Sequence, residues 1–249
     1  MTTVNTAFND EQFANPYPDG IEHHYWTAAR NRIVHRVVTR LLNKGSTGVV
    51  LDIGCGRGIT VDFLRRRDIR TIGCEIGLPT PISADTAPHL FLECDAFELA
   101  AEVRNACELL LILDVLEHLP DPESFLRQCY VSFPQAKNIL VTVPARMELW
   151  TNYDRYYQHF LRYDMSSLRA MCPTDSYELT SSSYFFHGLY VPARLLAYLH
   201  KDRAVTIYAP SLTSRSLHRL LAWCFSWEQR LLPAHLVGTS LMGILRRRR

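Results

Sequence analysis

Three glycines stand at alternate positions directly after a short apolar run, in the segment LDIGCGRG at positions 51–58. Glycine in such a turn lets the backbone pass close to a ligand, because no Cβ is in the way. A dinucleotide fingerprint would require glycine where Ile59 stands, and a P-loop would require lysine followed by serine or threonine. Asp52 would repel a pyrophosphate and suits a cationic ligand. The spacing therefore favours a cation-binding turn over a dinucleotide site or a plain tight turn.

This pattern resembles the first motif of the class I S-adenosylmethionine-dependent methyltransferases, and the resemblance extends over roughly residues 48–187. It is closest to the group that contains ubiquinone-pathway O-methyltransferases and bacterial enzymes acting on cell-envelope glycans or lipids. The resemblance implies an α/β fold, a doubly wound, seven-stranded Rossmann-like sheet with an antiparallel last strand. It also implies that the loop residues follow the amino-acid end of the cofactor S-adenosyl-L-methionine, and that Asp52 orients this loop or the ligand; those loop residues are Gly54, Cys55, Gly56 and Gly58.

Further cofactor contacts are predicted at the ends of the next three strands. Glu75 closes the second strand, where a carboxylate can accept hydrogen bonds from both ribose hydroxyls, although a solvated glutamate would also fit. By resemblance, Asp95 accepts the adenine amino group and Ala96 offers its backbone N–H. Asp95 is equally suited to cap a helix, and the two roles can coexist. Asp114 ends the fourth strand and opens a loop that continues with Val115; by resemblance, this loop lies beside the methionine part of the cofactor and faces the substrate.

His118 is the candidate catalytic residue, because a hydroxyl must lose its proton as it attacks the methyl group and histidine titrates near the working pH. In-line positioning can supply much of the catalysis, and a bracing role for His118 stays open. Asp114, Glu117 and His118 also match a D/E-x-x-E-H pattern that supports a divalent metal in some ubiquinone-pathway enzymes. No metal is predicted here.

The segment 153–163, after the fifth strand, resembles the G-H-x-R-R-Y segment of the group, although the glycine is absent and Leu161 replaces the first arginine. His159, Arg162 and Tyr163 are predicted to contact a polar or anionic substrate. A lid packed on the core explains the same residues equally well.

Apolar runs that alternate with helical segments must position these residues. Strands are predicted over 48–53, 70–75, 90–94, 108–114, 138–144, 177–186 and, last, 236–245. Helices are predicted over 121–133, with Asp121 as N-cap, and over 165–171. The alternation indicates βαβ units and a parallel sheet. Between the second and third strands, residues 77–88 carry three prolines, so no regular helix is expected there.

Residues 1–47 are predicted to form an N-terminal arm and a covering helix, which spans about 22–43 and stops at Asn43-Lys44-Gly45. This helix can place Arg30 near the cofactor carboxylate. Ordinary packing of Trp26 with a surface arginine is the preferred interpretation.

Residues 48–249 are predicted to form the methyltransferase domain, with a helical insertion at about 188–235 that contains helices over 190–200 and 213–231. The chain has 27 basic and 25 acidic residues, but residues 188–249 carry ten basic and only two acidic ones, a charge of +8. This segment can make a peripheral contact with an anionic membrane or a phosphorylated lipid carrier. A solvated basic tail is the favoured interpretation.

Composition limits the class of protein. Hydrophobic residues at 47% and charged residues at 21% argue against disorder, and no run is long enough to span a bilayer. Seven scattered cysteines without a CxxC pair disfavour structural zinc and indicate reduced thiols, and the N-terminus lacks signal-peptide features. A cytoplasmic protein is therefore predicted, with oligomeric state unspecified.

The predicted function is methyl transfer from S-adenosylmethionine to an oxygen of a small-molecule, glycan or lipid-linked acceptor. The alternatives are a non-catalytic binding protein with the same fold, and methylation of an RNA or protein acceptor. Ile59 disfavours a nicotinamide oxidoreductase. No N-P-P-[YF]-type loop follows the fourth strand, so DNA is not expected as a partner.

Overall fold

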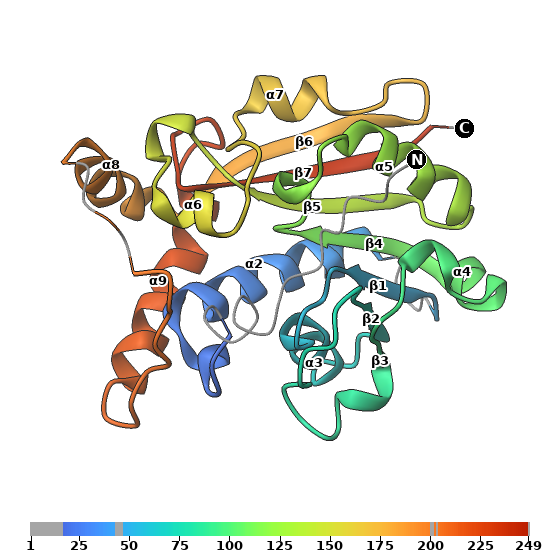
Figure 1. Ribbon diagram of the computed structural model, residues 1–249, viewed down its shortest axis with the longest axis horizontal. Coiled ribbons are helices and arrows are strands. Elements are labelled where there is room, and N and C mark those ends of the chain that lie inside the picture. The colour runs from blue at the N-terminus through green and yellow to red at the C-terminus, as the bar shows by residue number, and fades with distance from the viewer. Residues whose placement is uncertain (1–16, 43–46, 200–201, 203, 249) are drawn as a thin grey trace.

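The computed structural model describes residues 17–42, 47–199, 202 and 204–248. Within these residues, one sheet of seven strands has the order β3-β2-β1-β4-β5-β7-β6 (Figure 1). Strands β1 to β5 are parallel to one another, and β7 is antiparallel to both β5 and β6. The strands are β1 Val49–Ile53, β2 Thr71–Cys74, β3 Leu90–Phe91, β4 Cys107–Leu113, β5 Asn138–Pro144, β6 Tyr177–Phe185 and β7 Ser240–Arg247. The predicted seven-stranded sheet with an antiparallel last strand is confirmed.

Helices cover both faces of this sheet, as the doubly wound prediction requires. One face carries α2 (Tyr25–Leu41), α3 (Ile59–Arg65) and α9 (Arg215–Leu231). The other carries α4 (Ala101–Ala106), α5 (Pro122–Ser132) and α7 (Met165–Ala170). The two short helices α6 (Asn152–Tyr156) and α8 (Tyr190–Tyr198) follow strand ends at the opposite edge from the C-terminal end of β7 (Figure 1).

The central strand β1 is buried along its whole length. Leu51 packs into the core on the α5 side, whereas Val50 packs on the α2 side. Strands buried on both faces read as continuous apolar runs, which explains why the sequence pattern identified them. Asp52 is the exception, because it places a carboxylate inside this buried strand.

Two strand boundaries differ from the prediction by more than two residues. The third strand ends at Phe91 rather than 94, and the last begins at Ser240 rather than 236. Pro233 starts a turn there, in which the Leu236 N–H donates to its carbonyl at 3.0 Å. The segment 77–88 contains no α-helix, as its prolines predict, and only a 3-10 turn forms at Ala87–His89.

The N-terminal helix α2 shares one hydrophobic core with the sheet, since Ile33 and Val34 pack in the same cluster as Leu111 of β4. The predicted stop at Asn43-Lys44-Gly45 lies outside the described residues. At its other end, α2 is preceded by a 3-10 turn, Ile21–His23.

Up to Arg248, the basic C-terminus continues the sheet and its contacts, and it does not form a tail beside the helical insertion. Arg246 and Arg247 belong to β7, where Arg246 pairs with Asn138 at the start of β5. Arg247 donates to the Tyr130 carbonyl at 2.7 Å and stacks on that ring, and the Arg248 backbone N–H donates to Ser176. Because β7 is antiparallel to β5, these arginines lie at the edge of the sheet opposite α8 and α9 (Figure 1). Among the described helices, none has the length and apolar character needed to cross a bilayer.

Candidate functional site

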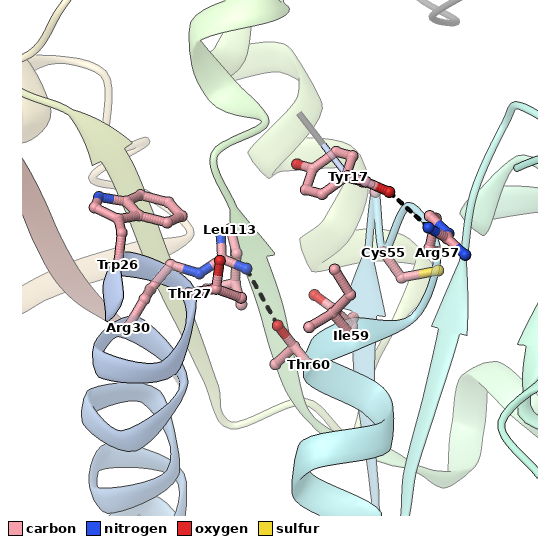
Figure 2. Close-up of a pocket in the computed structure, with 11 residues that line it drawn as sticks. Tyr17, Trp26, Thr27, Arg30, Cys55, Arg57, Ile59, Thr60 and Leu113 are labelled. Carbon is pink, nitrogen blue, oxygen red and sulfur yellow. Dashed lines mark hydrogen bonds between the residues drawn. The ribbon is translucent and has the colours of Figure 1, made fainter. Parts of the chain in front are cut away.

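The strand order reverses between β1 and β4, so the connections that leave their C-terminal ends run in opposite directions. In doubly wound sheets this switch point is the usual ligand-binding crevice. A pocket opens there, lined by the N-terminal arm, α2, the glycine loop, α3 and β4 (Figure 2). The lining residues are Tyr17, Trp26, Thr27, Arg30, Asp52, Gly54, Cys55, Arg57, Ile59, Thr60 and Leu113.

The glycine loop has the left-handed backbone that its sequence predicts, with φ of 74° at Gly54, 52° at Gly56 and 79° at Gly58. A Cβ on Gly54 would lie 2.6 Å from Val115 Cγ2, so this glycine allows the loop after β4 to pack on the loop after β1. A Cβ on Gly56 would meet only Tyr17 Cε2, at 3.9 Å, among described atoms. Gly56 therefore leaves a face open to a ligand.

Asp52 is 2% exposed, and its Oδ1 has no hydrogen-bond partner among the described residues. Burial raises its pKa from 3.8 to about 7, which the positive charge of Arg30 opposes and the carboxylates of Glu75 and Asp114 reinforce. A buried acid without a partner is costly unless a cation or donor joins it. Its position on the pocket wall fits the predicted cationic ligand.

Glu75 links the second strand to the glycine loop. Its Oε2 accepts from the Gly56 N–H at 2.9 Å, and its Oε1 accepts from the Gly77 N–H at 3.1 Å. Each carboxylate oxygen can accept a further hydrogen bond, so the two donors do not exclude ribose hydroxyls. Burial raises the pKa of Glu75, and these N–H donors oppose the rise.

The predicted adenine-binding turn begins beside Glu75, whose carbonyl accepts from the Cys94 N–H at 3.1 Å. Asp95 is exposed and caps the turn that follows, accepting from the Phe97 N–H at 2.9 Å. The capping role is thus confirmed, and Ala96 beside it is buried. Contact of Asp95 and Ala96 with adenine stays a prediction.

Arg30 is buried rather than on the surface, which makes the preferred sequence interpretation wrong. Its guanidinium donates to Asp114 Oδ2 at 2.5 Å and to Thr60 Oγ1 at 3.2 Å, and it lies 5.1 Å from the centre of the Trp26 ring (Figure 2). Asp114 adopts φ of 57°, an unusual conformation for a residue with a side chain, and Thr142 also donates to its carboxylate at 3.3 Å. Arg30 thereby holds the loop after β4 against α2.

Tyr17 and Arg57 are site residues that the sequence did not single out. The Arg57 guanidinium donates to the Tyr17 carbonyl at 2.6 Å and to Asp19 at 2.7 Å, which ties the arm to the glycine loop (Figure 2). Burial raises the pKa of Tyr17 to about 12, and the charges that act on it come from Arg30, Asp114, Glu75 and Glu117. The Tyr17 ring therefore lies among the predicted cofactor carboxylates. Its only sequence signal is a tyrosine between two prolines.

His118 and His159, the histidines predicted for catalysis and substrate binding, lie against each other. Their ring centroids are 4.8 Å apart, with His118 on the turn after β4 and His159 on the segment after β5. Burial and the neighbouring His159 lower the pKa of His118 to about 3. His118 is thus neutral at physiological pH and does not titrate near the working pH as the sequence argument assumed.

A buried carboxylate holds His159 in place. Asp154 is fully buried, and its Oδ1 accepts from His159 Nδ1 at 2.9 Å and from Arg162 Nε at 2.7 Å. Burial alone would raise the pKa of Asp154, but these two partners lower it to about 2. Arg162 and Tyr163 are 6% and 1% exposed, and the Tyr163 hydroxyl donates to the Leu116 carbonyl at 3.2 Å. These contacts give both a structural task, and their contact with substrate stays a prediction.

A metal ion would find a different ligand set from the one the sequence pattern indicates. Ligand atoms of Glu117, His118 and His159 all lie within 4.8 Å of one another. The carboxylate of Asp114 is held by Arg30. Burial raises the pKa of Glu117 well above its usual range, and its Oε2 has no partner among the described residues.

A family model described as a methyltransferase domain matches residues 25–182, more than half of the chain. The chain belongs to this methyltransferase family. Among curated proteins, it is similar to ubiquinone biosynthesis O-methyltransferases from Pseudomonas entomophila (32% identity over 88 residues) and Chromobacterium violaceum (34% over 86). These alignments cover 32% of this chain and 38% and 37% of the relatives. The methyltransferase chain therefore matches well under half the length of these relatives.

Two solved structures share the fold of the methyltransferase. A SAM-dependent methyltransferase from Archaeoglobus fulgidus has a TM-score of 0.52 at 18% identity, covering 91% of this chain and 97% of its own. Magnesium protoporphyrin IX methyltransferase from Synechocystis, solved with bound SAH, has a TM-score of 0.53 at 10% identity, covering 96% and 92%. At these identities the similarity concerns the fold.

Proposed function

We propose that this methyltransferase transfers the methyl group of S-adenosyl-L-methionine to an oxygen atom of a small-molecule, glycan or lipid-linked acceptor. The observation that carries the proposal is the buried carboxylate of Asp52, whose Oδ1 has no hydrogen-bond partner among the described residues, on the wall of a pocket at the β1–β4 switch point. A carboxylate there favours a ligand with an amino group and a sulfonium over one with a pyrophosphate.

The chain offers donors and acceptors for this cofactor after the C-terminal ends of neighbouring strands. The open face of Gly56 would lie against the amino-acid end, and Glu75 would accept the ribose hydroxyls. Asp95 and Ala96 follow on the next strand end, where adenine is expected. When bound, the cofactor supplies a methyl group on a positively charged sulfur, which is already a strong electrophile.

The acceptor side needs a group that takes the hydroxyl proton as the oxygen attacks. His118 is neutral, so a ring nitrogen can accept a hydrogen bond from the acceptor hydroxyl over the whole physiological pH range. His159 lies against it and is oriented by Asp154. A base with a pKa of about 3 is weak, so we assign more of the catalysis to in-line positioning than to proton abstraction.

The choice of oxygen as the acceptor atom rests on this pair of imidazoles and on the O-methyltransferases to which the chain is similar. A cytoplasmic location stays a prediction; the cysteines are all free thiols, which supports it.

The test has two parts. Calorimetry with S-adenosylhomocysteine should give saturable binding that Glu75→Gln weakens at least about tenfold, because a neutral amide accepts hydroxyl donors less strongly. Glu123→Gln, at an exposed residue of α5 in an ion pair with Arg127, is the matched control. No binding at millimolar ligand would refute the enzyme and favour a non-catalytic protein.

The second part identifies the acceptor. The protein is incubated with methyl-labelled cofactor and fractionated cell extract, and the label is followed into lipid, glycan, small-molecule, RNA and protein fractions. Label in one of the first three fractions supports the proposal when fragmentation mass spectrometry of the labelled product places the methyl group on an oxygen. Label confined to RNA or protein would refute the proposed acceptor class.

A further inference from the structure

Helix α9 turns an apolar stripe away from the core. Leu217, Leu220, Trp223, Trp227 and Leu231 recur every three or four residues, and they are between 38% and 76% exposed. These five residues are called the α9 face below. A surface helix of a globular protein normally shows the opposite pattern, with polar residues outward.

The opposite side of α9 packs against the rest of the protein, so the exposed stripe is not needed to hold the helix in place. Ala222 and Ser226 are buried, in a helix that packs along α2 at the edge of the molecule (Figure 1). These small residues let α9 lie close to α2. The large side chains of the α9 face therefore point to solvent, where single exposed leucines are ordinary but a five-residue stripe with two tryptophans is not.

An arginine cluster borders the α9 face on the side of α2. Arg36 of α2 donates to the backbone carbonyl of Ser226 on α9. Arg219 and Arg230 of α9 act electrostatically on Arg32 and Arg36, and the ion pairs among the described residues include none of these four. Burial lowers the pKa of Arg32 and Arg36, and neighbouring arginines lower it further. Like charges held together in this way favour an anionic partner.

We propose that the α9 face and its arginine border bind the surface of an anionic phospholipid membrane. Tryptophan and leucine insert at the boundary of headgroups and acyl chains, and arginines beside them contact anionic headgroups. The Arg230 guanidinium lies 5.0 Å from the Trp227 ring centre, so a cationic group and an aromatic ring that can both contact a membrane lie side by side. A second copy of this chain fits less well, because pairing two α9 faces would bring the arginine borders together.

The surface lies near the proposed active site. The imidazole of His218 on α9 accepts from the backbone N–H of Tyr25, the first residue of α2, which also carries Trp26 and Arg30 of the pocket wall. Membrane binding would thus hold the pocket close to a lipid-linked acceptor. The inference itself requires only the surface and not the proposed reaction.

Vesicle binding tests the proposal without any methyl acceptor. The full chain is mixed with vesicles of phosphatidylcholine alone, or of equimolar phosphatidylcholine and phosphatidylglycerol, and followed by co-sedimentation and tryptophan emission. We expect binding and a blue shift with the anionic vesicles, little with the neutral ones, and loss of binding at high salt.

Paired variants test which surface is responsible. Leu220→Ser combined with Trp223→Ser should weaken binding at least about tenfold, since both side chains would enter the interface. Val131→Ser, at a 78% exposed residue on α5, is the matched apolar control and should change nothing.

Charge variants complete the set. Arg219→Gln and Arg230→Gln should each weaken binding about fivefold, whereas Arg169→Gln, at an exposed residue on α7, should not. Equal binding to both vesicle types, or unchanged binding by the paired serine variant, would overturn the proposal. So would a concentration-dependent dimer in lipid-free ultracentrifugation that the serine variant abolishes, because the face would then join two copies. Circular dichroism confirms that each variant is folded.

Discussion

Replacing Asp52 by asparagine should stabilise the protein and weaken its cofactor site. Burial raises the pKa of Asp52 from 3.8 to about 7, so folding disfavours its ionised form. When folding raises the pKa of an acid, the folded protein has its full stability at pH values below the unfolded-state pKa. That stability falls as the pH rises from the unfolded-state pKa to the folded-state pKa. Each pKa unit corresponds to about 1.4 kcal/mol, so the loss above pH 7 amounts to at most about 4 kcal/mol.

Asparagine is nearly isosteric and carries no charge, so Asp52→Asn should recover about 2–4 kcal/mol in the free energy of unfolding at pH 8. The gain should shrink by about 1.4 kcal/mol for each pH unit between pH 7 and pH 5. Urea unfolding of both proteins, monitored by circular dichroism at pH 8, 6 and 5, measures it. Asp85→Asn, at an exposed carboxylate, is the matched control and should show no gain.

The same substitution should reduce affinity for S-adenosylmethionine more than for S-adenosylhomocysteine, since only the former carries the sulfonium charge. Calorimetry with both ligands measures the difference. The reasoning fails if Asp52→Asn is less stable than wild type at pH 8, or if its gain is independent of pH. Either result would mean that the carboxylate has a stabilising partner in the folded protein.

Three further predictions concern other parts of the site. His118→Ala should lower turnover only about 10- to 100-fold with cofactor affinity nearly unchanged, because a base with a pKa of about 3 abstracts protons weakly; a loss of affinity would instead assign His118 to the binding wall. Arg57→Ala should release the arm that carries Tyr17, because it removes the hydrogen bond to the Tyr17 carbonyl. We expect faster proteolysis of the arm and about tenfold weaker binding of S-adenosylhomocysteine. Unchanged binding would show that the arm plays no part in cofactor binding. Asp154→Asn should lower the free energy of unfolding in urea at pH 7 by about 3 kcal/mol, because Arg162 stays buried without its partner, and adding Arg162→Met should restore part of it. With a pKa of about 2, below the usual value, the stabilisation by Asp154 is intact above about pH 4 and is lost as pH falls toward 2; a loss already between pH 7 and 5 would contradict this.

The parts of the site that sequence reasoning located depend on local geometry. The turn after β1 requires a left-handed backbone at Gly54, Gly56 and Gly58, and glycine adopts this conformation readily. Three closely spaced glycines therefore indicate such a turn in the sequence. Buried parallel strands produce continuous apolar runs, so the ends of β2 and β4, and with them Glu75 and Asp114, could be read from the chain to within one residue. The proline-rich segment 77–88 was likewise predictable, because proline acts on its own backbone.

The tertiary structure decided what those residues touch. Arg30 and Asp114 are far apart in the chain and meet only because the strand order reverses between β1 and β4 and α2 covers the gap. His159 lies against His118 because β5 is the neighbour of β4.

The basic C-terminal region shows the same difference between what the sequence determines and what the tertiary structure determines. Composition determines that residues 188–249 are strongly basic, and their order in the chain groups the C-terminal arginines with the helical insertion. The antiparallel course of β7 instead carries Arg246 and Arg247 to the far edge of the sheet, while α9 packs on α2. The sequence by itself thus determined the glycine loop, the strand ends and the amount of charge, all of which are local or additive properties. Which charges and side chains share a surface depends on strand order and direction, and these are set by the packing of the whole chain.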